Sequence, residues 1–173
     1  MCGGCRDGLV AAAAFGAAGA VAAATAAASP VVVTRCDQII GSQKAPVRAR
    51  YQVVLGRVDV PVYLPRKAVS VAIAGWPYWS KAGLIVRAQS GVVTITVPPA
   101  WRGKAAITWG NGYPPPQSRL RIAPCGPTPD NWNAYAGGLY IRTRAACVPL
   151  NVRVGGQSRS VRIGVGGSCS RQR

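Results

Sequence analysis

The 173-residue chain contains no histidine, and its four acidic residues (Asp7, Asp37, Asp59 and Asp130) are all aspartates, so glutamate is absent as well. Without histidine, the chain cannot form a Ser-His-Asp triad or a Cys-His nucleophile pair, nor can it hold a histidine-ligated zinc ion. Without glutamate, it cannot form the paired-glutamate site of many glycosidases. These absences favour a binding or structural role over an enzyme, and we expect neither a metal nor a cofactor.

Basic residues are abundant by contrast. The chain has 21 Lys+Arg and a formal net charge of +17, and only four of the basic residues are lysines. A GC-rich genome explains the excess of arginine over lysine as well as anion recognition does. It does not explain the shortage of acidic residues, whose codons remain available. Because net charge bears on partners rather than on fold, the composition indicates a surface that meets something anionic.

The amino-terminal segment is long and uncharged. Residues 9–28 are mostly alanine, enough to span a bilayer as a helix. They end in Ala26-Ala27-Ala28, a small-x-small pattern that suits signal peptidase. We expect residues 1–28 to be a cleaved signal peptide or an uncleaved membrane anchor, residues 29–35 a linker, and residues 36–173 one domain. An ordinary alanine-rich helix is the third alternative.

Four cysteines remain beyond this segment: Cys36, Cys125, Cys147 and Cys169. An even number in an exported chain is typical of disulfides, and their spacing resembles no zinc site. Two strand-like runs, 148–154 and 160–165, are joined by a glycine-containing turn and flanked by Cys147 and Cys169, so a hairpin brings these two within reach of a bridge. By elimination, Cys36 pairs with Cys125.

The domain has an apolar periodicity of two, which is typical of half-buried strands. Val93, Ile95 and Val97 alternate with Thr94 and Thr96. Short runs of this kind, separated by Pro and Gly turns, predict an all-β fold: an antiparallel β-sandwich or partly open barrel of about eight strands. The expected strands are 51–60, 84–88, 92–97, 105–109, 119–122, 139–142, 148–154 and 161–165. No helix is expected after residue 35.

The same alternation locates part of the positive charge. Five arginines occupy the polar phase of their strands and should face solvent: Arg119, Arg121, Arg142, Arg153 and Arg162. If those strands are neighbours, the arginines form an anion-binding face. The alternative is a solvated sheet face whose charges prevent edge-to-edge association.

Aromatic residues are concentrated in the middle of the chain, most densely in Trp76-Pro77-Tyr78-Trp79. In loops of an exported β domain, Trp76, Tyr78 and Trp79 could form a platform that stacks on sugar rings, or they could close the end of a sandwich. Basic residues beside them also suit single-stranded nucleic acid, but export makes that a poor partner, and no specific nucleic-acid partner is expected.

Several stretches of the domain stand out together: residues 76–84, Ile107-Thr108-Trp109-Gly110-Asn111-Gly112, 134–138 and Cys147-Val148-Pro149-Leu150, with Cys169 near the end. In combination they resemble a group of exported proteins from high-GC actinobacteria. The resemblance covers most of residues 36–173. It implies a secreted or envelope location but carries no catalytic or binding residues. Cys147 and Cys169 fall in matching stretches, which is consistent with a structural bridge.

The sequence therefore predicts a non-enzymatic, cationic, disulfide-bonded domain of the cell envelope, outside the cytoplasm, that binds an anionic polymer or lipid surface. A module for a protein partner is the main alternative, and a carbohydrate-binding domain or an unusual hydrolase is less favoured. Ser80-Lys81 is the nearest approach to a Ser-Lys hydrolase pair, but neighbours on a strand point to opposite faces.

Overall fold

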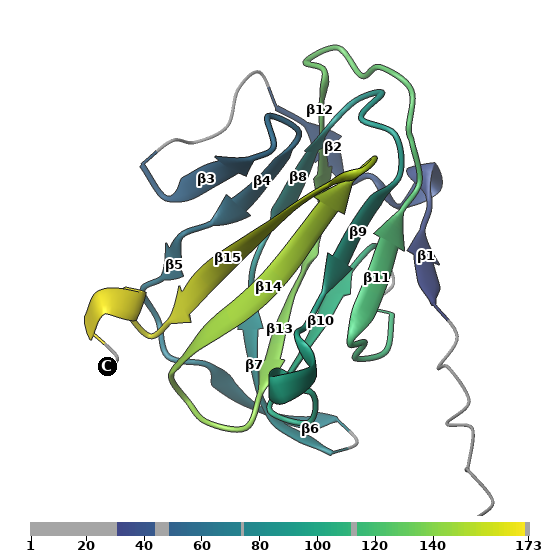
Figure 1. The fold of residues 1–173 in the computed structure, drawn as a ribbon. Coiled ribbons are helices and arrows are strands. Elements are labelled where there is room, and N and C mark those ends of the chain that lie inside the picture. Colours follow the sequence, from purple (N-terminus) through teal and green to yellow (C-terminus); the bar gives the residue numbers. More distant parts are fainter. Residues whose placement is uncertain (1–30, 44–48, 74, 112–113, 172–173) are drawn as a thin grey trace, which may run out of the picture.

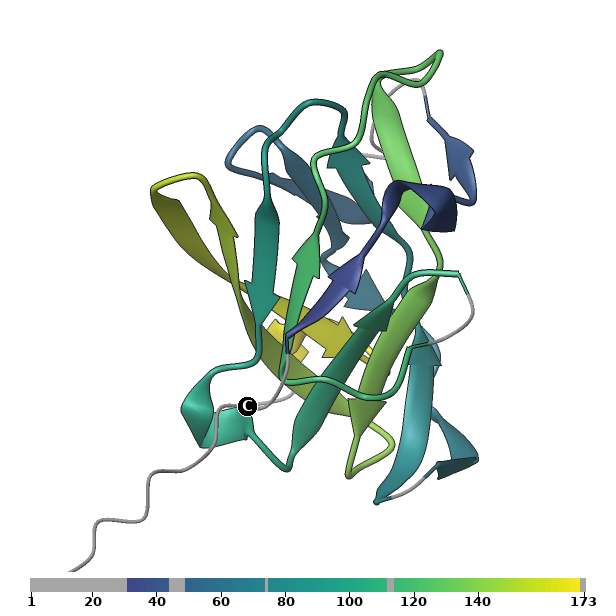
Figure 2. The ribbon, with the colours of Figure 1, turned by 90° about the vertical axis from the view of Figure 1, so that its right-hand side faces the viewer.

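A computed structural model of the chain describes residues 31–43, 49–73, 75–111 and 114–171. Within these residues the fold is all-β, with fifteen strands in three open sheets and short 3-10 turns. Figures 1 and 2 show the six-stranded sheet on one side of the molecule and the two other sheets packed against its inner face. The expectation of an all-β fold is confirmed.

The six-stranded sheet carries most of the alternating runs. Its strands, in spatial order, are β1 (Val32–Thr34), β11 (Arg119–Ile122), β9 (Val93–Thr96), β14 (Ala146–Val154), β15 (Gln157–Val165) and β5 (Tyr63–Leu64). The longest pair, β14 and β15, is a hairpin whose turn is Gly155-Gly156, and Gly155 adopts a positive φ of 57°. Glycine suits this turn because a two-residue hairpin requires left-handed backbone.

The remaining strands form two further sheets. The four-stranded sheet consists of β10 (Ala105–Trp109), β13 (Gly137–Ile141), β7 (Trp76–Lys81) and β6 (Val69–Ile73). The five-stranded sheet consists of β2 (Gly41–Ser42), β12 (Trp132–Tyr135), β8 (Leu84–Arg87), β4 (Val58–Pro61) and β3 (Tyr51–Val54).

One apolar core joins all three sheets. The inward residues of β9, β11, β14 and β15 belong to the same buried cluster as Leu84 of β8, Tyr135 of β12 and Trp109 of β10. The Trp109 indole Nε1 donates to the carbonyl of Ala82 at 2.8 Å, and the buried hydroxyl of Thr34 donates to the Trp109 carbonyl at 2.6 Å. These two bonds satisfy buried polar groups while they tie β1, β10 and the turn before β8 together.

The structure corrects the expected strand inventory. The described residues contain fifteen strands rather than about eight, because 51–60 divides into β3 and β4 and because β1, β2, β5, β6, β7 and β12 were not expected. Both outer strands of the six-stranded sheet, β1 and β5, pair in parallel with their neighbours, so the sheet is not purely antiparallel. Strand β1 also lies within 29–35, the segment expected to be a linker.

Strand β13 departs from the expected alternation. All of its residues are buried, including Tyr140 at 3% exposure, against which Trp76 packs. The strand lies very close to its neighbours. A Cβ built on Gly138 would be 2.2 Å from the carbonyl oxygen of Ser80, and one on Gly137 would be 1.9 Å from that of Thr108.

Both disulfides form as predicted: Cys36–Cys125 and Cys147–Cys169. The first links the turn after β1 to the segment after β11, and the second links the start of β14 to the turn that follows β15. Disulfides persist in oxidising compartments, so the pair indicates an environment outside the cytoplasm.

The expected signal or anchor, residues 1–28, lies outside the described residues. Among the helices of the described part of the chain, none has the length and apolar character needed to cross a bilayer.

Candidate anion-binding site

The six-stranded sheet turns the arginines of β11 toward solvent. Leu120 and Ile122 are fully buried in the core, so Arg119 and Arg121, which alternate with them, are exposed on the outer face. On β9, Val93 and Ile95 are buried in the same way and Thr94 and Thr96 face outward. The period-two pattern of the sequence thus fixes which side chains share the outer face.

Strand order then brings arginines from distant segments together. Arg121 of β11 and Arg153 of β14 are both in register with Thr94 of the intervening β9. One row along, Arg119 is in register with Thr96, which in turn faces Asn151 of β14. Three of the five predicted arginines therefore lie together around β9 on the outer face. We call Arg119, Arg121, Arg153 and Thr94 the basic face.

The basic face is hollowed rather than flat. A depression of about 300 Å³ is lined by the four residues of the basic face together with the loop Ser90-Gly91-Val92 and Gly155. The guanidinium of Arg153 is partly fixed, since its Nε donates to the Gly155 carbonyl at 3.2 Å. An anion seated here would meet guanidinium donors from two strands and a threonine hydroxyl between them.

The positive charge of the basic face has no counter-charge in the described part of the chain. Of the aspartates described, Asp37 pairs with Arg35, and Asp130 accepts a hydrogen bond from the Ser42 hydroxyl at 2.8 Å. Asp59 is completely buried in β4. Uncompensated guanidinium groups on an exposed surface attract anions, most strongly at low salt.

Asp59 is unusual in its own right. It lies between the core residues Val58 and Val60, in register with Ile85, and neither carboxyl oxygen has a hydrogen-bond partner. Burial raises its pKa to about 6, because the charged form loses hydration. Burial, followed by the nearby charge of Asp59, also raises the pKa of Tyr51.

The other two predicted arginines lie outside the basic face. Arg162 is on β15, on the same outer face, but it lines a separate depression near Gln52 and Pro149. Arg142 follows β13 in another sheet, where its Nε donates to the Gly103 carbonyl at 2.9 Å and its guanidinium carbon lies 5.1 Å from the centroid of the Trp76 ring.

The three aromatic residues predicted to form a platform lie in a strand, β7, and do not share one flat surface. Trp76 packs against Tyr140 with ring centroids 6.4 Å apart. Tyr78 packs against the core and lies under the Arg144 guanidinium. Trp79 is in register with Tyr140 and lines a third hollow with Leu64 and Lys81. All three are half-buried.

Sequence reasoning missed the hydroxyl residues of the site. Thr94 stood out only as the polar phase of a strand, yet the register places it between two arginines. Ser90 and Gly91 carry no signal of their own, since they belong to a short connection between β8 and β9. The alternation that located Arg121 also located Thr94, but strand order was needed to join them.

Two further findings limit the chemistry of the chain. The described residues hold no cluster of three or more cysteine or aspartate side chains placed to bind a metal. Ser80 is buried at 7% exposure while Lys81, its neighbour on β7, is exposed on the opposite side.

No protein-family model matches the chain, and no match was found among curated proteins.

Proposed function

We propose that the chain is an exported, non-enzymatic β-sandwich domain of the cell envelope that binds anionic polymers or lipid head groups through the basic face. The observation that carries this proposal is the register of Arg121 and Arg153 on either side of Thr94, with Arg119 beside them. Export, retention in the envelope and the resemblance to exported actinobacterial proteins belong to the same proposal.

The geometry supports a charged, extended ligand. The depression is open and lined by three arginines, and its donors come from a sheet whose inner face packs against the core. A linear polyanion or a lipid surface can satisfy several guanidinium groups at once, which multiplies weak single contacts.

The non-enzymatic part of the proposal is supported by composition and by placement. The chain has no histidine or glutamate to act as a base. Asp37 pairs with Arg35, Asp59 is completely buried, Asp130 accepts a hydrogen bond from Ser42, and none of the three lines the depression of the basic face.

The test is binding of the disulfide-bonded protein to vesicles of phosphatidylglycerol in phosphatidylcholine, and to immobilised polyphosphate, across a sodium chloride series. The variant Arg119→Gln/Arg121→Gln/Arg153→Gln should bind at least about tenfold more weakly, since three charge-assisted contacts are removed. The matched control, Arg57→Gln/Arg66→Gln/Arg87→Gln, removes the same charge from exposed positions elsewhere.

The two probes distinguish the two ligand sources, and neutral vesicles should not bind. Equal weakening by both triple variants would show that net charge alone, not the basic face, drives binding. Binding that does not respond to salt would also contradict the proposal, because exposed charges are screened over about 10 Å at 0.1 M salt.

A further inference from the structure

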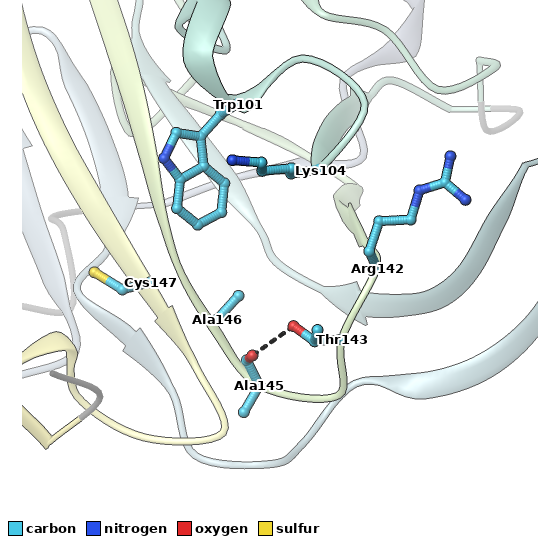
Figure 3. Close-up of a pocket in the computed structure, with 7 residues that line it drawn as sticks. All are labelled: Trp101, Lys104, Arg142, Thr143, Ala145, Ala146 and Cys147. Atoms are coloured by element: carbon cyan, nitrogen blue, oxygen red, sulfur yellow. Dashed lines mark hydrogen bonds between the residues drawn. The ribbon is translucent and has the colours of Figure 1, made fainter.

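A larger hollow, of about 490 Å³, lies away from the basic face, where the 3-10 turn η2 (Pro99–Trp101) meets the turn between β13 and β14. Figure 3 shows Trp101 and Lys104 above it, Arg142 to one side, and the segment 143–147 below. Its size falls within the range of about 300–1,000 Å³ that is usual for small-molecule sites.

The walls of this hollow are held in place. Trp101 is half-buried and packs against the core, so its indole has limited freedom. The Thr143 hydroxyl donates to the Ala145 carbonyl at 2.7 Å, which fixes the turn below (Figure 3). At the end of that turn, Cys147 is bonded to Cys169. A hollow built on such supports needs little ordering when a ligand enters.

The charged groups that line the hollow are both cationic. Lys104 is exposed, and it lines the hollow together with Trp101 (Figure 3). Arg142 points away from these two, because its guanidinium contacts the Gly103 carbonyl and the Trp76 ring. No described aspartate lines the hollow. Lys104 is therefore the cation available to a ligand, and the hollow combines one aromatic face with one positive charge.

We propose that this hollow is a second binding site, which takes a sugar ring carrying one carboxylate, a unit of the hexuronic acid type. The C–H face of a pyranose ring packs against an aromatic face while its hydroxyls remain free for water and backbone groups. The carboxylate pairs with Lys104, and the ring stacks on Trp101. The basic face contributes no residue to this site, so the inference stands apart from the proposed function.

The experiment follows tryptophan indole N–H resonances by NMR during titration of the disulfide-bonded protein with D-glucuronate. D-glucose and acetate serve as comparison ligands, and Trp101→Phe assigns the Trp101 signal. Glucuronate should shift the Trp101 indole and the amides of residues 143–146. Glucose should bind at least about tenfold more weakly and acetate should not move the indole, since each lacks one of the two recognised features.

Lys104→Gln keeps the hollow and removes its charge. It should weaken glucuronate binding at least about tenfold and leave weak glucose binding unchanged. Lys81→Gln and Arg121→Gln are the matched controls, outside the hollow, and should leave glucuronate binding unaltered. Equal binding of glucose and glucuronate, a response centred on the basic face, insensitivity to Lys104→Gln, or no shift of Trp101 at millimolar ligand would each overturn the proposal.

Discussion

Arg121 and Arg153 lie two strands apart on one face of the six-stranded sheet, each in register with the same residue of the strand between them. Adjacent strands are about 4.8 Å apart, which puts the two Cα atoms about 10 Å from each other. Arg119 lies about 7 Å further along β11. This spacing suits a polymer or a lipid surface that carries several negative charges better than it suits a single small anion.

The first prediction concerns the number of charges used. Removing Arg121 or Arg153 singly by substitution with Gln should lower the slope of log K against log salt for polyphosphate by about one in each case, because each arginine displaces about one counterion from the polymer. Binding titrations at four or more salt concentrations measure the slope. Arg57→Gln should leave it unchanged, and an equal fall for Arg57→Gln would contradict a localised site.

The second prediction concerns Asp59. Its pKa is about 6 in the folded chain, above the 3.8 that is ordinary for a hydrated aspartate, so the folded state holds the proton more tightly. The free energy of unfolding should be highest below pH 4 and should fall by about 3 kcal/mol as the pH rises through 6.

Urea unfolding of the wild type and of Asp59→Asn between pH 4 and 7.5 measures this contribution. Asp59→Asn cannot titrate and should lose that part of the pH dependence. Asp130→Asn is the control, since its carboxylate accepts a hydrogen bond from Ser42 at a half-buried site. If the free energy of unfolding depends on pH in the same way for the wild type and for Asp59→Asn, Asp59 does not hold its proton more tightly in the folded state, and the prediction is wrong.

The third prediction concerns the crowding of β13. A Cβ on Gly138 would stand 2.2 Å from the Ser80 carbonyl oxygen, so Gly138→Ala must push β13 from β7 and should destabilise the fold by about 3 kcal/mol or more. Gly41→Ala, on β2, places its methyl group in open space and should change stability by less than about 1 kcal/mol. Thermal unfolding compares the two, and similar melting temperatures would contradict the close approach.

The fourth prediction compares the two disulfides. Cys36–Cys125 closes a loop of 89 residues and Cys147–Cys169 one of 22. In the chain-entropy model these are worth about 4.6 and about 3.4 kcal/mol. Paired serine variants should therefore show the greater loss for Cys36→Ser/Cys125→Ser in denaturant unfolding. The reverse order would indicate that strain or residual structure outweighs loop length.

Sequence patterns predicted the strands that bury one face, such as β9 and β11, because a period of two is visible without knowing the neighbours. They failed for β7, whose mix of half-buried, buried and exposed residues shows no period of two, and for short edge strands such as β1, which have too few residues to show a period. For β13 they located the strand but not the burial of all its residues. The disulfides were predictable because the expected hairpin places Cys147 and Cys169 together. Only Cys36 and Cys125 then remain to form the second bridge.

The candidate site was predictable only in part, for a related reason. Alternation shows that Arg119, Arg121 and Arg153 face solvent, but it does not show that β9 lies between β11 and β14. That arrangement depends on long-range pairing, which no local pattern records. It separates Arg142 from the basic face and selects Thr94 as a member of it.

The pairing of β1 with β11 bears on the order in which parts of the fold can form. Val32 is in register with Leu120, and Cys36 is bonded to Cys125. As the chain emerges from a ribosome or a translocation pore, its first strand has no partner until residue 122 has followed it. During synthesis or export, the outer strand of the six-stranded sheet and the bridge that secures it therefore cannot form until residues 122 and 125 have emerged.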